Sequence, residues 1–153
     1  MPLRPPLVLT SPDNPRLKAV VHLRKHRDRR ESGLFIAEGS REIERALVAG
    51  LSLRELFFCP EVARLTFEHL PKRFPRLSEL QRAPSIYQIT PPLFSKIAYL
   101  DKPEGILATF DQPTWTLDSL PTNDRDLFLI AQGIEKPGNL GAMVRTAFAT
   151  VSK

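Results

Sequence analysis

The sequence predicts an α/β fold in which a parallel or mixed sheet carries helices on both faces. The main observation is an alternation between short apolar runs, which have the length of buried strands, and segments whose apolar residues recur at helical spacing. A second observation is that proline and glycine fall mainly between these segments, where they mark connections. Such an alternation is typical of a sheet covered by helices on both sides.

The individual elements follow from the same signals. Asn14 before Pro15 is a typical helix start, because asparagine caps free N–H groups and proline has none to lose. Gly50 is expected to end one helix and Pro71 another. The predicted elements, in chain order, are an extended lead-in at 1–12, a helix at 15–27, a strand at 34–37, a helix at 40–49, a strand at 53–59, a helix at 61–70, a short helix at 77–81, a strand at 86–89, a helix at 91–99, a strand at 106–110, a strand at 127–131 and a helix from 140 onward.

The charge of the chain points to a polyanionic partner. The formal net charge is +5 over 153 residues, a moderate excess that favours nucleic acid. Much of it lies in the first predicted helix and its tail, which would suit contact with phosphates. A solvated helix face is the alternative reading of such a basic run. The basic residues are Arg16, Lys18, Arg24, Lys25, Arg27, Arg29 and Arg30.

Other chemistry is less favoured by the composition. The single cysteine, Cys59, excludes an internal disulfide and follows two phenylalanines, so we expect a buried, inert thiol. His22 and His26 are spaced to share a helix face, but no third ligand is near, and no metal site is predicted. No apolar run has the length of a membrane span and the first ten residues lack a signal-peptide core, so the prediction is a cytoplasmic protein without membrane contact.

The last stretch of the chain predicts an anion site. The apolar run at 127–131 is expected to be a buried strand, a glycine-containing loop follows, and Asn139 is expected to cap a helix whose apolar face packs on the sheet. The free N–H groups at such a helix start attract anions, and Lys136 and Arg145 add positive charge. The alternative is an ordinary capped helix with an exposed arginine.

Known phosphate motifs match this stretch poorly. The spacing from Gly133 to Gly138 is that of a P-loop, but Asn139 and Leu140 replace the required lysine and hydroxyl residue, which disfavours a nucleotide-hydrolysing enzyme. The run from Gly138 to Gly141 matches the GXXG loop of KH domains, a weak signal of nucleic-acid binding because only two of its positions are fixed.

A more specific match covers residues 135–147, which read EKPGNLGAMVRTA. This run resembles the first motif of the SpoU/TrmH family of RNA 2′-O-ribose methyltransferases. Asn139 and Arg145 match the family's invariant pair, so the resemblance implies that both are catalytic and that Arg145 acts at the ribose and phosphate of the target nucleotide. A guanidinium keeps its proton at neutral pH, so it cannot accept another one and act as a base. We therefore expect Arg145 to position the phosphate and to stabilise the forming 2′-alkoxide.

Two further runs resemble the RNA-binding N-terminal domain of that family. Residues 30–39 read RESGLFIAEG, and residues 102–108 read KPEGILA. Arg29, Arg30, Glu38 and Arg41 fall at matching positions, although a carboxylate repels phosphate and Glu38 is better explained as a cap or turn partner. Gly39 is expected to take a positive φ. The resemblance implies a three-layer α/β/α ribosomal-protein-like RNA-binding domain at 1–112, a linker at 113–126 anchored by Trp115, and the first strand and helix of an α/β knot domain at 127–153.

The resemblance also implies a function. The chain is expected to be the N-terminal part of an S-adenosylmethionine-dependent RNA 2′-O-ribose methyltransferase. Its expected partner is a structured RNA, and rRNA is preferred to tRNA. The family's cofactor motifs are not among these residues, so we expect no cofactor binding and no activity from this chain alone, and a homodimer for the full-length enzyme. The alternative is an RNA-binding module without catalysis. The residues expected to bind RNA are Arg16, Lys18, Arg24, Lys25, Arg27, Arg29, Arg30, Arg41 and Lys136.

Overall fold

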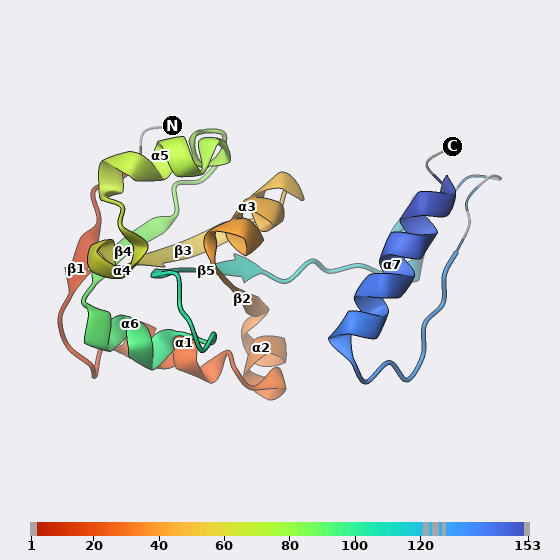
Figure 1. The fold of residues 1–153 in the computed structure, drawn as a ribbon, viewed down its shortest axis with the longest axis horizontal. Helices are drawn as coiled ribbons and strands as arrows, with labels where there is room; N and C mark the ends of the chain where they lie inside the picture. The colour runs from red at the N-terminus through yellow and green to blue at the C-terminus, as the bar shows by residue number, and fades with distance from the viewer. Residues whose placement is uncertain (1–2, 121–122, 124–125, 127, 152–153) are drawn as a thin grey trace. The chain divides into compact units, whose positions relative to one another are not determined.

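The computed structural model describes residues 3–120, 123, 126 and 128–151, and in them the predicted α/β fold is confirmed (Figure 1). The chain divides into two compact units between Thr114 and Trp115. The first unit holds one mixed sheet with helices on both faces. The second unit holds a short 3₁₀ turn and one long helix.

The sheet has five strands in the spatial order β1-β4-β3-β5-β2. The strands β1, β4 and β3 run parallel, and β5 is antiparallel to both of its neighbours. Residues of β5 alternate between two apolar cores, with Ile106, Ala108 and Phe110 in one and Leu107 in the other. A strand buried on both faces explains why this segment reads as a continuous apolar run. The strands are β1 Leu7–Leu9, β2 Leu34–Glu38, β3 Leu53–Phe58, β4 Ser85–Ile89 and β5 Ile106–Asp111.

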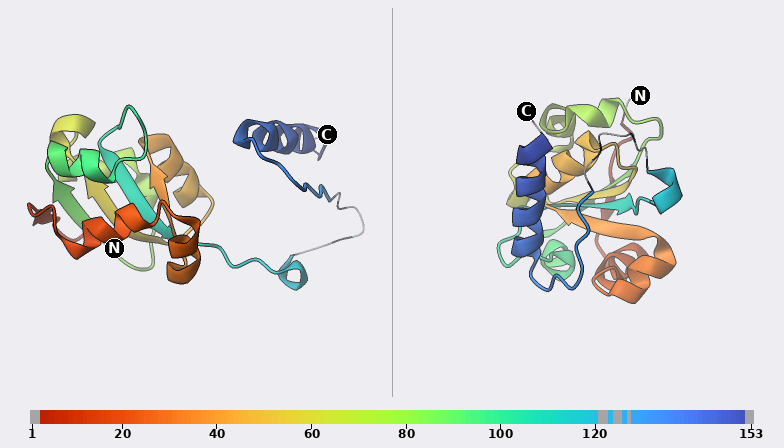
Figure 2. Two further views of the ribbon diagram at one scale, coloured as in Figure 1. Left: turned by 90° about the horizontal axis from the view of Figure 1, so that it is seen from below. Right: turned by 90° about the vertical axis from the view of Figure 1, so that its right-hand side faces the viewer.

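Helices cover both faces of this sheet, which gives three layers (Figures 1 and 2). One core contains Leu17 of α1 (Pro15–His22), Phe94 of α6 (Pro91–Ile97) and the stacked rings of Phe57 and Tyr87, whose centroids are 4.9 Å apart. The other core contains Ile43, Ala46 and Leu47, the predicted core face of α3 (Ser40–Val48), together with residues of α5 (Leu70–Arg73) and the 3₁₀ turn η2 (Pro75–Ser78). Each fully buried Phe or Leu contributes about 1.5–3 kcal/mol.

The helix predicted at 61–70 is wrong. The chain forms α4 (Pro60–Ala63), the 3₁₀ turn η1 (Phe67–His69) and then α5. Arg64 ends α4 with a positive φ of 54°, and Thr66 caps η1 through its side chain. Pro71 does not stop a helix but lies in the first turn of α5, where its missing N–H costs nothing. The short helix predicted at 77–81 is likewise replaced by η2.

The extended lead-in contains a strand that the sequence did not predict. Strand β1 pairs in parallel with β4, and Leu7 lies opposite Tyr87. The strand is at the edge of the sheet, and its residues Leu7 and Val8 are exposed. Because it is three residues long and half-solvated, its apolar pattern is too short to distinguish it from a loop.

The second unit differs more from its prediction. The 3₁₀ turn η3 (Leu117–Ser119) is followed by a segment without strand structure at 128–131, and then by α7 (Pro137–Val151). The predicted strand also included Leu127, which lies outside the described residues. A strand needs a hydrogen-bonding neighbour, and the described residues of this unit contain none, so Ile130 is 91% exposed. Trp115 is 68% exposed and does not anchor the linker as predicted.

The buried cysteine predicted from the sequence is confirmed. The Cys59 side chain is fully buried in the core below α1 and α6, and its Sγ donates a hydrogen bond to Oε2 of Glu61 at 3.3 Å. Burial raises the pKa of this thiol above its ordinary value, so little thiolate is present at neutral pH.

We expect Cys59 of the folded chain to react with a disulfide reagent at pH 8 on the order of 100-fold more slowly than in denaturant. The buried thiol stays largely protonated, and the reagent cannot reach it without local unfolding. The rate is measured by absorbance of the released thiolate with and without urea. Equal rates in the two conditions would show that the thiol is accessible in the folded state.

Candidate functional site

The basic segment at 15–32 forms two helices and not the single predicted helix. Asn14 caps α1 as predicted, because its Oδ1 accepts the N–H of Arg16 at 2.9 Å. After His22 the chain turns, and a second helix, α2, runs over His26–Ser32. His22 and His26 therefore lie on different helices, and the face that they were predicted to share does not exist.

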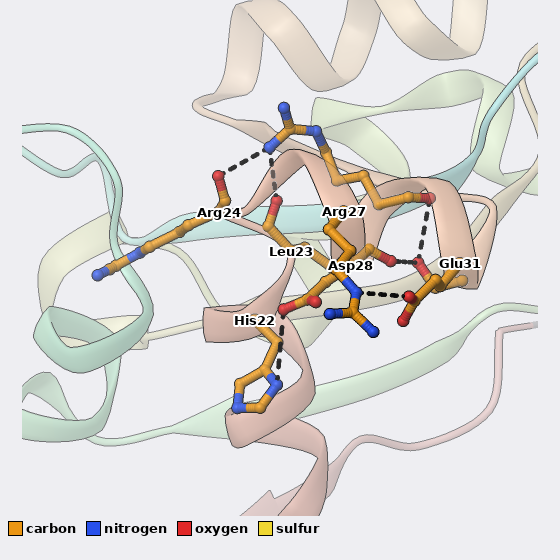
Figure 3. A network of polar contacts seen from close by, with 8 residues as sticks. His22, Leu23, Arg24, Arg27, Asp28 and Glu31 are labelled. Atoms are coloured by element: carbon orange, nitrogen blue, oxygen red, sulfur yellow. Dashed lines mark hydrogen bonds and ion pairs between the residues drawn. The ribbon is translucent and has the colours of Figure 1, made fainter.

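The break between α1 and α2, where Figure 3 labels Leu23 and Arg24, is held by the side chain of Arg29. Its Nη1 donates to the carbonyl oxygens of Leu23 at 2.9 Å and Arg24 at 2.8 Å. In a continuous helix these two carbonyls would accept N–H groups four residues further along. The guanidinium takes the place of those donors, so Arg29 has a structural function and points into the turn.

Four other predicted RNA-binding side chains also have partners within the protein. Three pair with carboxylates: Arg16 with Glu55 at 2.7 Å, Lys18 with Asp13 at 2.9 Å and Arg27 with Glu31 at 2.7 Å. Arg24 donates to the backbone carbonyls of Lys96 and Ala98. Exposed ion pairs stabilise a protein by only about 0–1 kcal/mol, but a partner carboxylate cancels part of the positive field that a phosphate would meet.

Three predicted side chains in the first unit are exposed and have no hydrogen-bond or ion-pair partner among the described residues, namely Lys25, Arg30 and Arg41. Lys25 and Arg30 belong to the segment before strand β2, and Arg41 belongs to α3, directly after it. The structure thus separates the predicted RNA-binding set into free cations near β2 and cations that hold the fold.

The C-terminal end of β2 is fixed by a buried carboxylate. Glu38 is buried, and its Oε2 accepts the N–H groups of Tyr99 and of Leu100, the latter at 3.0 Å. The side chain therefore holds the loop that follows α6, in agreement with its interpretation as a turn partner. This contact joins residues 61 positions apart, which no local sequence pattern could have identified.

The start of α3 is fixed by a second carboxylate that the sequence analysis missed. Glu104 accepts the N–H of Ser40 through its Oε2 at 2.8 Å. Gly39, which precedes Ser40, has a φ of 96°, and this confirms the predicted positive value. The N–H of Gly39 donates to the carbonyl of Ile106 at 3.0 Å. The helix N-terminus next to Arg41 is therefore already capped by an anionic group from the protein.

The predicted catalytic pair belongs to the second unit. Helix α7 begins at Pro137, so Asn139 lies in its first turn and is not the predicted N-cap. The reason is that proline at the first helical position is favoured, and the N–H of Asn139 already bonds to the carbonyl of Lys136 at 3.0 Å. Arg145 is exposed, and its Nη1 lies over Gly141, where a Cβ would come within 3.3 Å of it.

A shallow hollow of about 320 Å³ lies at the start of α7. Lys136, Asn139 and Met143 line it, together with the preceding loop from Gly133. Apolar side chains of α7, which were predicted to pack on a sheet, are exposed instead, including Val144 and Phe148. We assign no described residue to S-adenosylmethionine.

Two other features are absent from the described residues. No group of three or more His, Cys, Asp or Glu side chains there is arranged to hold a metal ion. No helix there is long and apolar enough to cross a membrane.

Comparisons with known proteins show which family the chain belongs to. The family model of the MRM3-like substrate-binding domain matches residues 14–108. The chain is similar to the 23S rRNA (guanosine(2553)-2′-O)-methyltransferase RlmP of Bacillus subtilis, with 27% identity over 141 residues, covering 92% of this chain and 50% of that protein. It is also similar to the crystal structure of an RNA 2′-O ribose methyltransferase, with 33% identity and a TM-score of 0.68, covering 94% of this chain and 52% of that one.

A third similarity shows the fold alone. The SpoU methyltransferase AviRb from Streptomyces viridochromogenes, in complex with AdoMet, is 22% identical with a TM-score of 0.58, covering 74% of this chain and 41% of that one. Together these comparisons confirm the resemblance to SpoU/TrmH methyltransferases. The chain spans about half the length of the Bacillus subtilis protein and of the 33% identical structure.

Proposed function

Since the chain belongs to the MRM3-like substrate-binding domain family, we propose that it is the RNA-binding, N-terminal part of an S-adenosylmethionine-dependent rRNA 2′-O-ribose methyltransferase. Its relative from Bacillus subtilis is named for this reaction on 23S rRNA. The first unit, which contains the matched residues 14–108, would hold the RNA. The second unit would contribute the start of the methyl-transfer site.

The observation that carries this proposal is the set of free cations near β2. Lys25, Arg30 and Arg41 are exposed and unpaired among the described residues, in the domain whose family model is named for substrate binding. Each cation that neutralises a phosphate releases a counterion from the nucleic acid, which makes binding strong at low salt and weak at high salt. The paired residues Arg16, Lys18 and Arg27 would contribute less. Arg29 would act by holding the turn between α1 and α2, and Arg24 by joining this turn to the end of α6.

The proposed role of Asn139 and Arg145 concerns the target nucleotide. The ribose 2′-oxygen gains negative charge as its proton passes to water. It then forms a bond to the methyl group that S-adenosylmethionine would supply in the longer protein, and the electron pair of the broken S–CH₃ bond stays on the sulfur. A guanidinium stays charged throughout the neutral range, so Arg145 would bind the adjacent phosphate and stabilise that developing charge. Asn139 would position the same nucleotide, and Lys136 would add to the positive field. We further propose that the full-length enzyme is a cytoplasmic homodimer.

The proposal is tested with the triple variant Lys25→Ala, Arg30→Ala and Arg41→Ala. Each lost phosphate contact weakens binding uniformly and lowers the salt slope by about 1, so the triple variant should bind a structured rRNA fragment roughly 10- to 100-fold more weakly at low salt. Binding is measured by fluorescence anisotropy. The matched control removes three exposed, unpaired cations elsewhere on the same unit, Arg4, Lys72 and Arg82.

The control variant carries the same net charge and is expected to lose less than about 3-fold in affinity. Equal losses in the two triple variants would mean that the chain binds RNA through its net charge alone, and the proposed surface would be wrong. Titration calorimetry of the wild-type chain with S-adenosylmethionine is expected to give no binding heat. A measurable cofactor affinity would contradict the assignment of the cofactor site to residues outside this chain.

The alternative of a non-catalytic RNA-binding module predicts a different result for one further variant. Under the methyltransferase proposal, Arg145→Ala leaves RNA affinity within about 2-fold of wild type, because a single contact to one nucleotide contributes little to binding of a structured RNA. If α7 is part of an RNA-binding surface, Arg145→Ala should weaken binding as much as Arg30→Ala does.

A further inference from the structure

A hollow of about 420 Å³ lies between α1, α2 and the sheet, and none of the roles described above uses it. Its apolar walls come from Val20 and Leu23 on the α1 side and Leu34 at the start of β2. Its floor is formed by the sheet residues Glu55 of β3 and Thr109 of β5. The volume is within the range of about 300–1,000 Å³ that is typical of small-molecule sites.

The floor holds a polar group without a partner. Thr109 is 1% exposed, and its Oγ1 is buried with no hydrogen-bond partner. A buried hydroxyl that makes no hydrogen bond is unfavourable, and valine would fill the same space without that penalty. Leu107, two residues earlier on the same face of β5, is apolar and packed in the core. Thr109 therefore marks the point at which this face of the sheet stops being core and becomes the floor of the hollow.

A carboxylate lies beside this hydroxyl. The strand register places Glu55 directly opposite Thr109, and opposite residues on one face have Cβ atoms about 4.5–5.5 Å apart. Oε1 of Glu55 accepts from Nη1 of Arg16 at 2.7 Å, and its side chain is 19% exposed. The ion pair with Arg16 orients the carboxylate, and each carboxylate oxygen can accept two hydrogen bonds, so both Oε1 and Oε2 can still accept from a ligand.

The rim of the hollow argues against an anionic ligand. Asp28 and Glu31 of α2 line it together with His22 of α1 (Figure 3). Oδ2 of Asp28 is 3.7 Å from Nδ1 of His22. The lining thus offers hydrogen-bond acceptors and apolar surface, a combination that suits an uncharged planar group with N–H donors at its edge.

We propose that this hollow binds an unstacked guanine base of the RNA, an inference that rests on the proposed function. Single-stranded RNA is recognised through bases that leave the stack and present their Watson–Crick edges. The N1–H and the N2 amino group of guanine lie side by side and match the two oxygens of a carboxylate, and the hydroxyl of Thr109 can accept or donate to the same edge. Adenine, cytosine and uracil each lack one of these two adjacent donors. Lys25 is the N-cap residue of α2 and Arg30 lies within α2, the helix that lines the hollow. Both side chains can therefore bind the phosphates on either side of the base.

The test uses fluorescein-labelled heptanucleotides of uridine with guanosine, inosine or uridine at the central position. Inosine lacks only the N2 amino group, so it isolates the second hydrogen bond to Glu55. We expect the wild-type chain to bind the guanosine oligonucleotide roughly 10-fold more tightly than the inosine one. Glu55→Gln should reduce this ratio to about 1, and Thr109→Val, which keeps the shape, should lower affinity for guanosine alone.

The matched control is Glu42→Gln, an exposed carboxylate on α3 outside the hollow, which should keep the wild-type ratio. Amide shifts of Glu55 and Thr109 in ¹⁵N-labelled chain report occupancy directly on addition of guanosine monophosphate, and they do not depend on how stable the variants are. If all three oligonucleotides bind equally and these shifts do not move, the hollow holds water only and the inference fails while RNA binding stands. If neither the oligonucleotides nor a structured rRNA fragment bind, both the inference about the hollow and the proposed function fail.

Discussion

Gly105→Ala is expected to destabilise the first unit by about 3 kcal/mol. Gly105 is buried and has a φ of 76°, a conformation that L side chains rarely adopt. A Cβ at this position would meet the backbone nitrogen of Ala63 and lie 2.8 Å from the Cβ of Val62 in α4. The carbonyl of Gly105 also accepts the N–H of Cys59 at 2.8 Å, so neither segment can move away without losing this hydrogen bond.

Gly50→Ala separates the two causes of this effect. Gly50 has nearly the same φ, 74°, but nothing lies within 4 Å of the Cβ that the substitution would add. Its variant should therefore show only the backbone strain, about 1 kcal/mol. Both free energies of unfolding are measured by urea denaturation. If the two variants lose the same stability, then the close packing of α4 on Gly105 contributes nothing and the account of this contact is wrong.

Glu38→Ala has the second largest expected effect, a loss of about 2 kcal/mol in the free energy of unfolding. The substitution removes the acceptor of two N–H groups, those of Tyr99 and Leu100, from a buried position. Hydrogen bonds to a charged group are worth about 1.5–3 kcal/mol, and water can replace part of this because both donor residues are exposed. The loop after α6 should become mobile while the sheet stays intact.

Amide hydrogen exchange measures directly whether the loop after α6 has become mobile. The Tyr99 and Leu100 amides should be protected in the wild-type chain and should exchange faster, on the order of 10-fold or more, in the variant. Glu42→Ala, which removes an exposed carboxylate from the first turn of α3, serves as the control. It should cost less than about 1 kcal/mol and leave the exchange of the two amides unchanged. Unchanged protection of the two amides in Glu38→Ala would mean that the carboxylate does not hold the loop.

Most of the fold could be predicted because its signals are local. Strands β2 to β5 are apolar runs, and Asn14, Pro15 and Gly50 mark helix ends where helices do end. The failures have tertiary causes. The break between α1 and α2 depends on the side chain of Arg29, which donates hydrogen bonds to two backbone carbonyls. No glycine or proline marks this break in the sequence. Strand β1 exists because β4 offers an edge for it to pair with.

The candidate site could be predicted only as a set of residue types. The sequence identifies a basic segment, but it does not show that Arg16 pairs with Glu55, 39 residues away, whereas Arg30 has no partner among the described residues. The hollow beside α2 depends on the register of β3 against β5, which places Glu55 opposite Thr109. Since register is set by the assembled sheet, no motif in the sequence points to these two residues.

RNA affinity of the wild-type chain as a function of salt tests the central claim most directly. Anisotropy titrations against a structured rRNA fragment at about 50 and about 200 mM salt should differ roughly 40-fold if Lys25, Arg30 and Arg41 each neutralise one phosphate, since each contact contributes about 0.9 to the logarithmic slope. Affinity that is independent of salt, or no binding at the lower concentration, would contradict the proposal that the cations near β2 bind the RNA backbone.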